Sequence, residues 1–104
     1  MEAEVRELTV EEKIIKELGE EFIGIAKCES GIRQFNEDGT VLTSRTSDKG
    51  IFQINQVHWK KAKELNLDID TIDGNIAYAK LLKENNGTRD WHMSAHCWKK
   101  HEAS

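Results

Sequence analysis

The segment FIGIAKCESG, residues 22–31, places a carboxylate at the end of an otherwise apolar helical stripe. Residues spaced i, i+3, i+4 and i+7 share one face of a helix of 3.6 residues per turn, and here they are Phe22, Ile25, Ala26 and Glu29. Three of the four are apolar, so this face has to be packed inward, and Gly31 can end the helix just after it. The sequence therefore predicts a helix over residues 20–30 with this face packed inward.

The position of Glu29 on this stripe has a chemical consequence. An apolar setting disfavours the charged form of a carboxyl group and raises its pKa. A Glu that keeps its proton near neutral pH is a candidate general acid. The alternative is a partly exposed Glu at a frayed helix end.

Composition limits the class of protein. The chain has 104 residues, of which 38% are hydrophobic and 33% charged, which is typical of one soluble globular domain spanning 1–104. Its net charge is −4 and no basic stripe is present, which disfavours nucleic-acid binding. The acidic start MEAEVRELTVEEK has no apolar segment of a signal peptide, so either the protein stays in the cytosol or a leader is not part of this chain.

Helix signals recur along the chain and predict a mainly α, α+β fold. Thr9 and Glu12 fit a capping box that opens a helix with the stripe Val10, Ile14, Ile15 and Leu18, and Gly19 ends it. Asn55 can cap a helix over 56–65, and Asp70 or Thr71 can cap another over 72–85 that stops at Gly87. The tail after it is expected to form one last helical turn.

The region between these helices carries the strand signals. Residues 31–50 are rich in Gly, Asn, Asp, Ser and Thr, and predict turns with one or two short strands. In IFQIN, residues 51–55, Phe52 and Ile54 alternate with Ile51, Gln53 and Asn55. This alternation predicts a short strand with a core face and a polar face.

The two cysteines, Cys28 and Cys97, allow two interpretations. A bridge between them would close a loop of about 70 residues and stabilise the fold by roughly 4 kcal/mol in the chain-entropy model. Reduced, they would be two small buried hydrophobic side chains.

The order of motifs resembles that of a known superfamily. AKCESG (26–31) is followed by DKGIFQIN (48–55), by GNIAYAKLL (74–82) and by Trp91 and Trp98. This order, over residues 12 to 98, resembles the lysozyme-like superfamily, and most closely the soluble lytic transglycosylase type of domain. The stretch from Glu29 to Asn55 is also similar to animal-type lysozymes. The resemblance implies a lysozyme-like fold with a short β-hairpin between helices.

The resemblance also implies an activity. It indicates a peptidoglycan-cleaving muramidase that acts on the β-1,4 bond between N-acetylmuramic acid and N-acetylglucosamine. In the transglycosylase route Glu29 serves as acid and then as base, and the 6-hydroxyl of the sugar closes a 1,6-anhydro ring. In the lysozyme route Asp48 is a second catalytic carboxylate; alternatively, Asp48 is only a turn residue. A third possibility is an inert glycan-binding or structural domain of the same fold.

Further site residues follow from the same motifs. The residues expected to contact substrate are Ser30, Gln53, Asn55, Asn75, Tyr78 and Trp91, with Trp98 as a further aromatic. Ser30 can instead orient Glu29 or cap a chain end, Asn75 can make a local bond at the helix start, and each aromatic residue can belong to the core. The tail is expected to close back on the Glu29 helix through a Cys28–Cys97 disulfide.

The expected partners are peptidoglycan strands or chito-oligosaccharides, for a monomer that needs no cofactor and no metal and that is secreted or periplasmic. Neither nucleic acid nor a membrane span is expected. One metal alternative exists: His92, His96, Cys97 and His101 are spaced closely enough in the tail for zinc.

Overall fold

The structure is a computed structural model that describes residues 7–102. The α-helices of this range are α1 (Val10–Leu18), α2 (Glu21–Ser30), α3 (Trp59–Glu64), α4 (Ile72–Asn86) and α5 (Ala95–Glu102). Two 3₁₀ segments, η1 (Gln56–His58) and η2 (Arg89–Ser94), precede α3 and α5. Strands β1 (Asp48–Lys49) and β2 (Ile54–Asn55) form a two-stranded antiparallel sheet. The prediction of a mainly helical α+β fold is confirmed.

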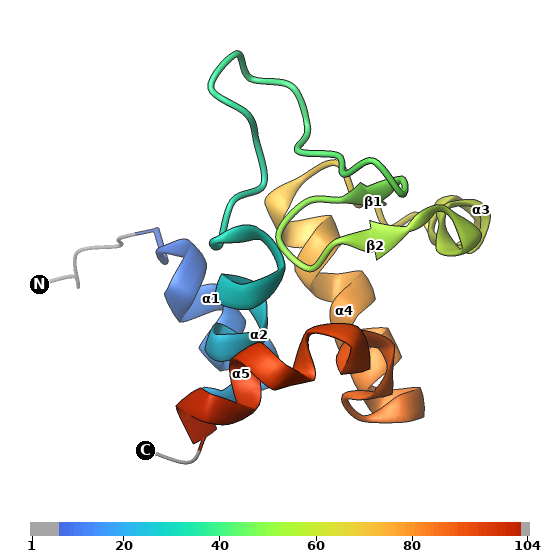
Figure 1. Ribbon diagram of the computed structural model, residues 1–104. Helices are drawn as coiled ribbons and strands as arrows, with labels where there is room; N and C mark the ends of the chain where they lie inside the picture. Colours follow the sequence, from blue (N-terminus) through green and yellow to red (C-terminus); the bar gives the residue numbers. More distant parts are fainter. Residues whose placement is uncertain (1–6, 103–104) are drawn as a thin grey trace, which may run out of the picture.

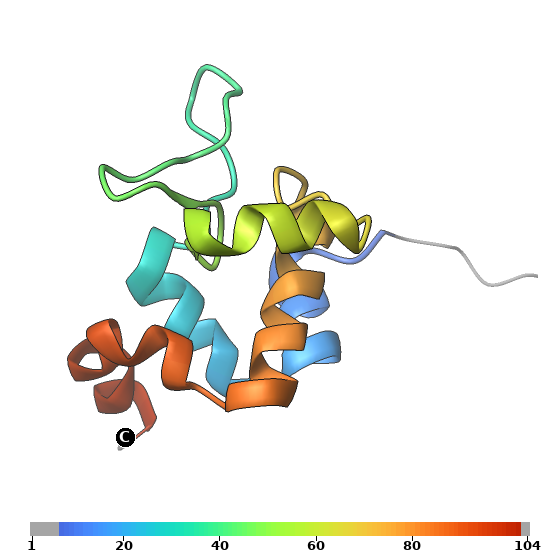
Figure 2. The same cartoon turned by 90° about the vertical axis from the view of Figure 1, so that its right-hand side faces the viewer.

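Helix α2 lies at the centre of the helical body, in contact with α1 and with α5, and α1 also packs on α4 (Figure 1). Between α2 and β1 the chain runs out from this body as a long loop and returns to the hairpin, as both views show (Figures 1 and 2). No helix within residues 7–102 is both long enough and apolar enough to span a membrane.

Local signals at the helix ends act as predicted. Thr9 Oγ1 accepts a hydrogen bond from the Glu12 amide at 3.1 Å, and Glu12 Oε1 accepts one from the Thr9 amide at 2.8 Å, which completes the capping box. Thr71 rather than Asp70 caps α4, because its Oγ1 accepts from the Gly74 amide at 3.0 Å. Asn55 Oδ1 accepts from the Val57 amide, and the helix it caps begins as η1 before α3.

One member of the predicted α1 stripe lies on the wrong face. Ile14 and Leu18 are fully buried, whereas Ile15 is 43% exposed. Successive residues on an α-helix are about 100° apart, so Ile15 is turned away from the line that joins Ile14 to Leu18. The core contacts a narrower face of α1 than the sequence indicates.

The apolar stripe of α2 is packed inward, as predicted. Phe22, Ile25 and Ala26 have no exposed surface. The Phe22 ring packs edge-to-face on Trp91 and Phe52, with centroid distances of 5.3 and 6.1 Å. Such aromatic pairs stabilise a core beyond their buried area.

The prediction of a strand over 51–55 is wrong for most of its length. Only Ile54 and Asn55 are in a strand, and residues 50–53 form the turn that joins it to β1. Gln53 has a φ of 50°, in the left-handed region, which breaks the alternation of an extended strand. Ile51 is therefore buried together with Phe52 and Ile54, although it was assigned to the polar face.

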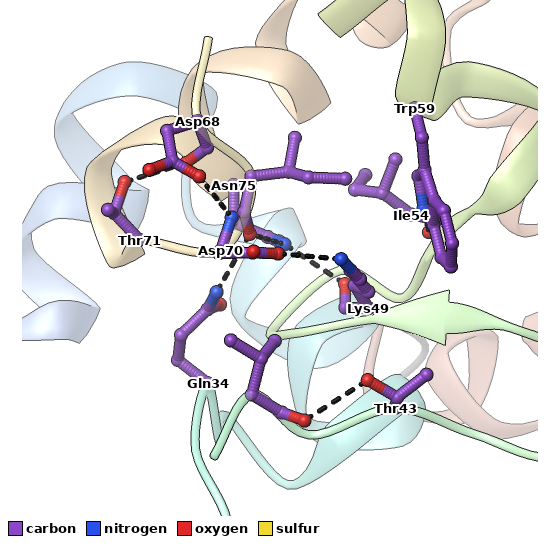
Figure 3. Close-up of polar contacts among 11 residues, drawn as sticks. Gln34, Thr43, Lys49, Ile54, Trp59, Asp68, Asp70, Thr71 and Asn75 are labelled. Carbon is purple, nitrogen blue, oxygen red and sulfur yellow. Dashed lines mark hydrogen bonds and ion pairs between the residues drawn. The ribbon is translucent and has the colours of Figure 1, made fainter. Parts of the chain in front are cut away.

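Two buried side-chain amides, Gln34 and Asn75, hold this turn in place, and Figure 3 shows both beside Lys49. Asn75 Oδ1 accepts from the Phe52 amide at 2.9 Å, and Asn75 Nδ2 donates to the Lys49 and Ile69 carbonyls at 3.0 Å. Gln34 Oε1 accepts from the Ile51 amide at 3.0 Å, and Gln34 Nε2 donates to the Ile69 carbonyl at 2.9 Å. Together they satisfy backbone groups that a buried turn would otherwise leave unpaired.

Gly50 is required at the centre of this network. Its φ is 73°, and a Cβ there would lie 2.3 Å from Gln34 Oε1 and 2.4 Å from Asn75 Nδ2. A side chain at position 50 would therefore displace both amides.

The tail is longer and more ordered than one helical turn. After Gly87, η2 and α5 follow, and α5 packs along α2. The predicted Cys28–Cys97 disulfide is confirmed, with Cα atoms 6.0 Å apart. Contact with α2, together with the burial of Trp98, supports a helix that the local sequence does not strongly favour.

The buried amide network generates a stability prediction. We expect Asn75→Ala to lower the free energy of unfolding by about 3 kcal/mol or more, because it removes the partner of buried backbone groups. Chemical denaturation of both proteins measures the difference. Asn86→Ala, an exposed Asn at the end of the same helix, is the matched control and should change stability by no more than about 0.5 kcal/mol. An equal effect of the two substitutions would contradict this account of the turn.

Candidate functional site

Glu29 lies in the last turn of α2 and faces a surface groove of about 310 Å³. The groove is lined by Cys28, Glu29, Ser30, Gly31, Arg33, Leu42, Ser44 and Gln53. One wall is thus the end of α2, and the other comes from the loop before the hairpin and from its turn. Glu29 itself is half-buried, so its carboxyl group lies at the border between core and solvent.

A side chain from the tail contacts this carboxyl group. Ser94, at the end of η2, donates a hydrogen bond from Oγ to Glu29 Oε2 at 2.5 Å. Burial raises the pKa of Glu29 above its ordinary value of 4.5; the Ser94 hydrogen bond lowers this pKa in part, and the nearby charge of Asp48 raises it again. The net shift is upward, which favours the protonated acid.

Asp48 lies in β1 in a different environment. Its Oδ2 accepts hydrogen bonds from the hydroxyls of Ser44, at 2.7 Å, and of Thr46, and its Oδ1 accepts from Asn55 Nδ2 at 2.8 Å. Burial alone would raise the pKa of Asp48, but the hydrogen bonds from Thr46, Ser44 and Asn55 together lower it further than burial raises it. Asp48 is therefore held as a carboxylate.

The two carboxyl groups are thus separated in pKa while their charges interact. Glu29 retains its proton to higher pH, and Asp48 loses its proton at lower pH. Two carboxyl groups whose environments shift their pKa values in opposite directions can divide acid and base roles between them. Ser44 belongs to the surroundings of both carboxyl groups: it lines the groove that Glu29 faces, and its hydroxyl donates a hydrogen bond to Asp48.

Two of the predicted substrate contacts lie at or beside the groove but differ in what they offer. Gln53 lines it, with Nε2 donating to the Gly50 carbonyl at 2.9 Å. Ser30 is buried, and its Oγ donates to the Ile51 carbonyl at 2.7 Å and accepts from the Arg33 amide at 3.1 Å. Ser30 therefore fastens the end of α2 to the hairpin turn, next to Glu29.

Asn55 serves the structure of the hairpin. Its Nδ2 donates to Asp48 and to the Thr46 carbonyl, and its Oδ1 caps η1. The polar atoms that were expected to meet sugar hydroxyls are already paired within the protein. Asn55 thus acts on the candidate site by positioning Asp48.

Three further expected contacts lie in the core. Asn75, Tyr78 and Trp91 are 0%, 1% and 3% exposed, so none of them presents a surface to a glycan. Tyr78 Oη hydrogen-bonds with His58 Nδ1 at 3.1 Å, and Trp91 Nε1 donates to the Phe52 carbonyl at 3.0 Å. The assignment of these residues to substrate binding is corrected: they are core residues whose polar atoms bond within the protein.

Sequence reasoning missed Ser94, Ser44 and Thr46. The hydroxyls at positions 44 and 46 precede Asp48 by four and two residues, a spacing at which Ser and Thr can bond an Asp within a turn. No local signal identifies Ser94. Its place follows only from the disulfide, since Cys97 is three residues after Ser94 and Cys28 immediately precedes Glu29.

The zinc alternative in the tail loses one ligand. Cys97 is bonded to Cys28 and has no thiolate to offer. Across residues 7–102 no group of three or more His, Cys, Asp or Glu side chains is placed to hold a metal ion. The side chain of His101 lies outside the described residues.

Comparison with known proteins gives no relative from which to transfer a function. No family profile, no curated protein and no solved structure matches the chain. The site has to be interpreted from its own geometry.

The raised pKa of Glu29 generates a prediction for stability. A buried acid with a raised pKa stabilises the fold fully at low pH, and this contribution is lost as pH rises through the folded-state pKa. We expect Glu29→Gln to gain stability relative to the parent as pH rises above about 4.5, where the ordinary pKa lies. Asp48 has a lowered pKa in both proteins, so its contribution to the pH dependence of stability cancels when the variant is compared with the parent.

Thermal unfolding of parent and variant across this pH range measures the effect. Glu21→Gln, an exposed Glu in the first turn of the same helix, is the control and should show no such pH-dependent gain. A Glu29→Gln difference that stays flat with pH would contradict the raised pKa.

Proposed function

We propose that this protein cleaves the β-1,4-glycosidic bond between N-acetylmuramic acid and N-acetylglucosamine in peptidoglycan, with Glu29 as the general acid, on a fold of the lysozyme-like type. The observation that supports this most is the environment of Glu29: a half-buried carboxyl group of raised pKa that opens into a groove. Cleavage of a glycosidic bond requires an acid that protonates the leaving oxygen and support for an oxocarbenium-like transition state. The choice of peptidoglycan as substrate comes from the resemblance of the motif order to the lysozyme-like superfamily.

The groove has groups suited to a sugar chain. Arg33 and Gln53 bring side-chain N–H donors, Ser44 brings a hydroxyl, and Leu42 gives an apolar contact. A groove of about 310 Å³ has room for few sugar units, so affinity would be modest. The net charge of −4 gives no general attraction to an anionic cell wall, so recognition would depend on these short-range contacts.

In the first step Glu29 transfers its proton to the glycosidic oxygen, and the bond to the anomeric carbon of the muramic acid unit breaks. Glu29 is then a carboxylate. In the transglycosylase route it takes the proton of the sugar's own 6-hydroxyl, whose oxygen bonds to the anomeric carbon and gives a 1,6-anhydro product. This route needs one carboxyl group, and Glu29 is the carboxyl group that lines the groove among the described residues.

A two-carboxylate hydrolase is the second candidate. The observation that favours it is Asp48, whose three side-chain hydrogen bonds keep it ionised and whose charge acts on Glu29. In this route the Asp48 carboxylate supports the sugar cation and water replaces the 6-hydroxyl as nucleophile.

The disulfide bears on where the protein works. Disulfides persist in oxidising surroundings such as the periplasm or the extracellular space, and Cys28–Cys97 fits such a location. Peptidoglycan is found in the same surroundings, so the proposed substrate and the covalent structure agree.

We expect Glu29→Gln to lower the rate of peptidoglycan cleavage by at least about 100-fold, since general acid catalysis contributes about 10²–10⁴-fold. Release of soluble muropeptides, followed by mass spectrometry, measures the rate. Glu21→Gln on the same helix should leave it unchanged. If the parent binds chito-oligosaccharides but releases no product, the protein is an inert glycan-binding domain and the proposed activity is wrong.

Asp48→Asn separates the two routes. A transglycosylase should keep most of its rate and release 1,6-anhydro ends, one water lighter than hydrolytic ends. A hydrolase that uses Asp48 should release reducing ends and lose most of its rate in the variant. Asp38→Asn, an exposed Asp in the same loop that also bonds a Thr hydroxyl, is the control and should match the parent in both cases.

A further inference from the structure

The Ser94 hydroxyl has two neighbouring acceptors and one proton. Its Oγ lies 2.5 Å from Glu29 Oε2 and 3.1 Å from the Trp91 carbonyl oxygen. A hydroxyl donates one hydrogen bond and accepts others, so Ser94 can donate to only one of these oxygens at a time. The protonation state of Glu29 determines whether Glu29 Oε2 is an acceptor for this proton.

Both protonation states can be satisfied by rotation of this one hydroxyl. When Glu29 is protonated, its O–H donates to Ser94 Oγ, and the Ser94 hydroxyl donates to the Trp91 carbonyl. When Glu29 is ionised, the Ser94 hydroxyl turns and donates to Glu29 Oε2. The Trp91 carbonyl then still accepts from Trp98 Nε1 at 3.1 Å, so no buried acceptor is left without a partner.

We infer that Ser94 is a positioning residue that follows Glu29 through its acid and base forms by turning its hydroxyl between the Glu29 carboxyl group and the Trp91 carbonyl. The inference rests on the proposed function, because it gives Ser94 a part in the acid–base cycle of Glu29. Its place is fixed by burial of Trp91 and Trp98 on one side and by the Cys28–Cys97 disulfide on the other. The tail thus supplies a partner that α2 alone does not have.

Other charged and titratable groups around Glu29 have to be separated from this effect. Asp48 acts on Glu29 from β1, and Arg33 lines the same groove. His92 on η2 and His96 on α5 are exposed imidazoles in the tail. All of these groups are retained when only Ser94 or only Glu29 is substituted. Variants at these two positions therefore separate the Glu29–Ser94 contact from the effects of the other charged groups.

The indole N–H of Trp98 reports on the proposed rotation. It bonds to the same Trp91 carbonyl that Ser94 would release when Glu29 ionises, so its hydrogen bond should strengthen at that point. Trp59 provides an internal control, because its indole donates to the Ile54 carbonyl, far from Ser94 in sequence and on the hairpin side. The two signals can be followed in one nitrogen-15 NMR titration, beside the carbon-13 signal of the Glu29 carboxyl group.

In the parent we expect the nitrogen-15 chemical shift of the Trp98 indole to change with pH at the same midpoint as the Glu29 carboxyl group. The chemical shift of the Trp59 indole should not change at this midpoint. Ser94→Thr keeps the hydroxyl and should keep this coupling. Ser94→Ala should abolish it and raise the Glu29 midpoint, because the hydrogen bond that lowers the pKa of Glu29 is lost. Glu29→Gln should also abolish the coupling. Met93→Ala, a substitution at the exposed neighbour, should behave as the parent does.

A Trp98 signal that does not follow Glu29 in the parent, or that still follows it in Ser94→Ala, would overturn the inference. The titration contains no glycan, so its result is independent of whether the parent cleaves peptidoglycan, and a failure of the proposed activity is detected separately by the muropeptide assay. If Ser94→Ala does not fold, which loss of the Trp59 and Trp91 indole signals would reveal, Ser94→Cys takes its place. A thiol is a weak hydrogen-bond donor, so the coupling should be lost or strongly reduced, and a Trp98 signal that follows Glu29 as in the parent would overturn the inference.

Discussion

The paired amides of Gln34 and Asn75 fix the hairpin turn on which the rest of the site is assembled. They bind backbone groups of residues 49, 51 and 52, while the carbonyls of Ile51 and Phe52 accept from other elements. The Ile51 carbonyl accepts from Ser30, at the end of α2, and the Phe52 carbonyl accepts from Trp91, in η2. Glu29 is adjacent to Ser30, and Ser94 follows Trp91 by three residues. The contact between Glu29 and Ser94 therefore depends on α2 and η2 both docking on this turn. Without the two amides the turn would not hold these segments in position.

The helices could be predicted because their signals are local. The Thr9 capping box, the cap at Thr71 and the stops at Gly19, Gly31 and Gly87 depend on residues within one turn of each helix end. The strand predicted over 51–55 failed for the opposite reason. Its alternating pattern suggested one buried face, but the segment is a turn enclosed by packing on several sides, so Ile51 is as buried as Phe52. Alternation cannot distinguish these cases, because the side chains that cover the segment come from elements distant in sequence, as Phe22 and Trp91 do for Phe52.

The site was predictable only in part, for a related reason. Residue type and helical phase located Glu29, and the motif that follows located Asp48. Neither reveals whether a polar group keeps its hydrogen-bonding capacity for a ligand. Asn75 and Asn55 are satisfied within the protein, and Trp91 is enclosed by Phe22 and Phe52. Ser94 shows the converse, since its local sequence is unremarkable and its role comes from tertiary closure, for which the pair of cysteines was the only clue in the chain.

The two carboxyl groups are controlled by different parts of the structure. Asp48 is held by hydroxyls of its own loop and by Asn55 across the hairpin, all within a short stretch of sequence. The environment of Glu29 is assembled from distant stretches: the core stripe of α2 buries it, and the tail, joined to α2 by the disulfide, supplies Ser94. Folding of the loop together with the hairpin can thus set the charge of Asp48, whereas the acid form of Glu29 requires the whole chain to close. In an isolated α2 the same Glu would meet water, and its pKa would have no reason to rise.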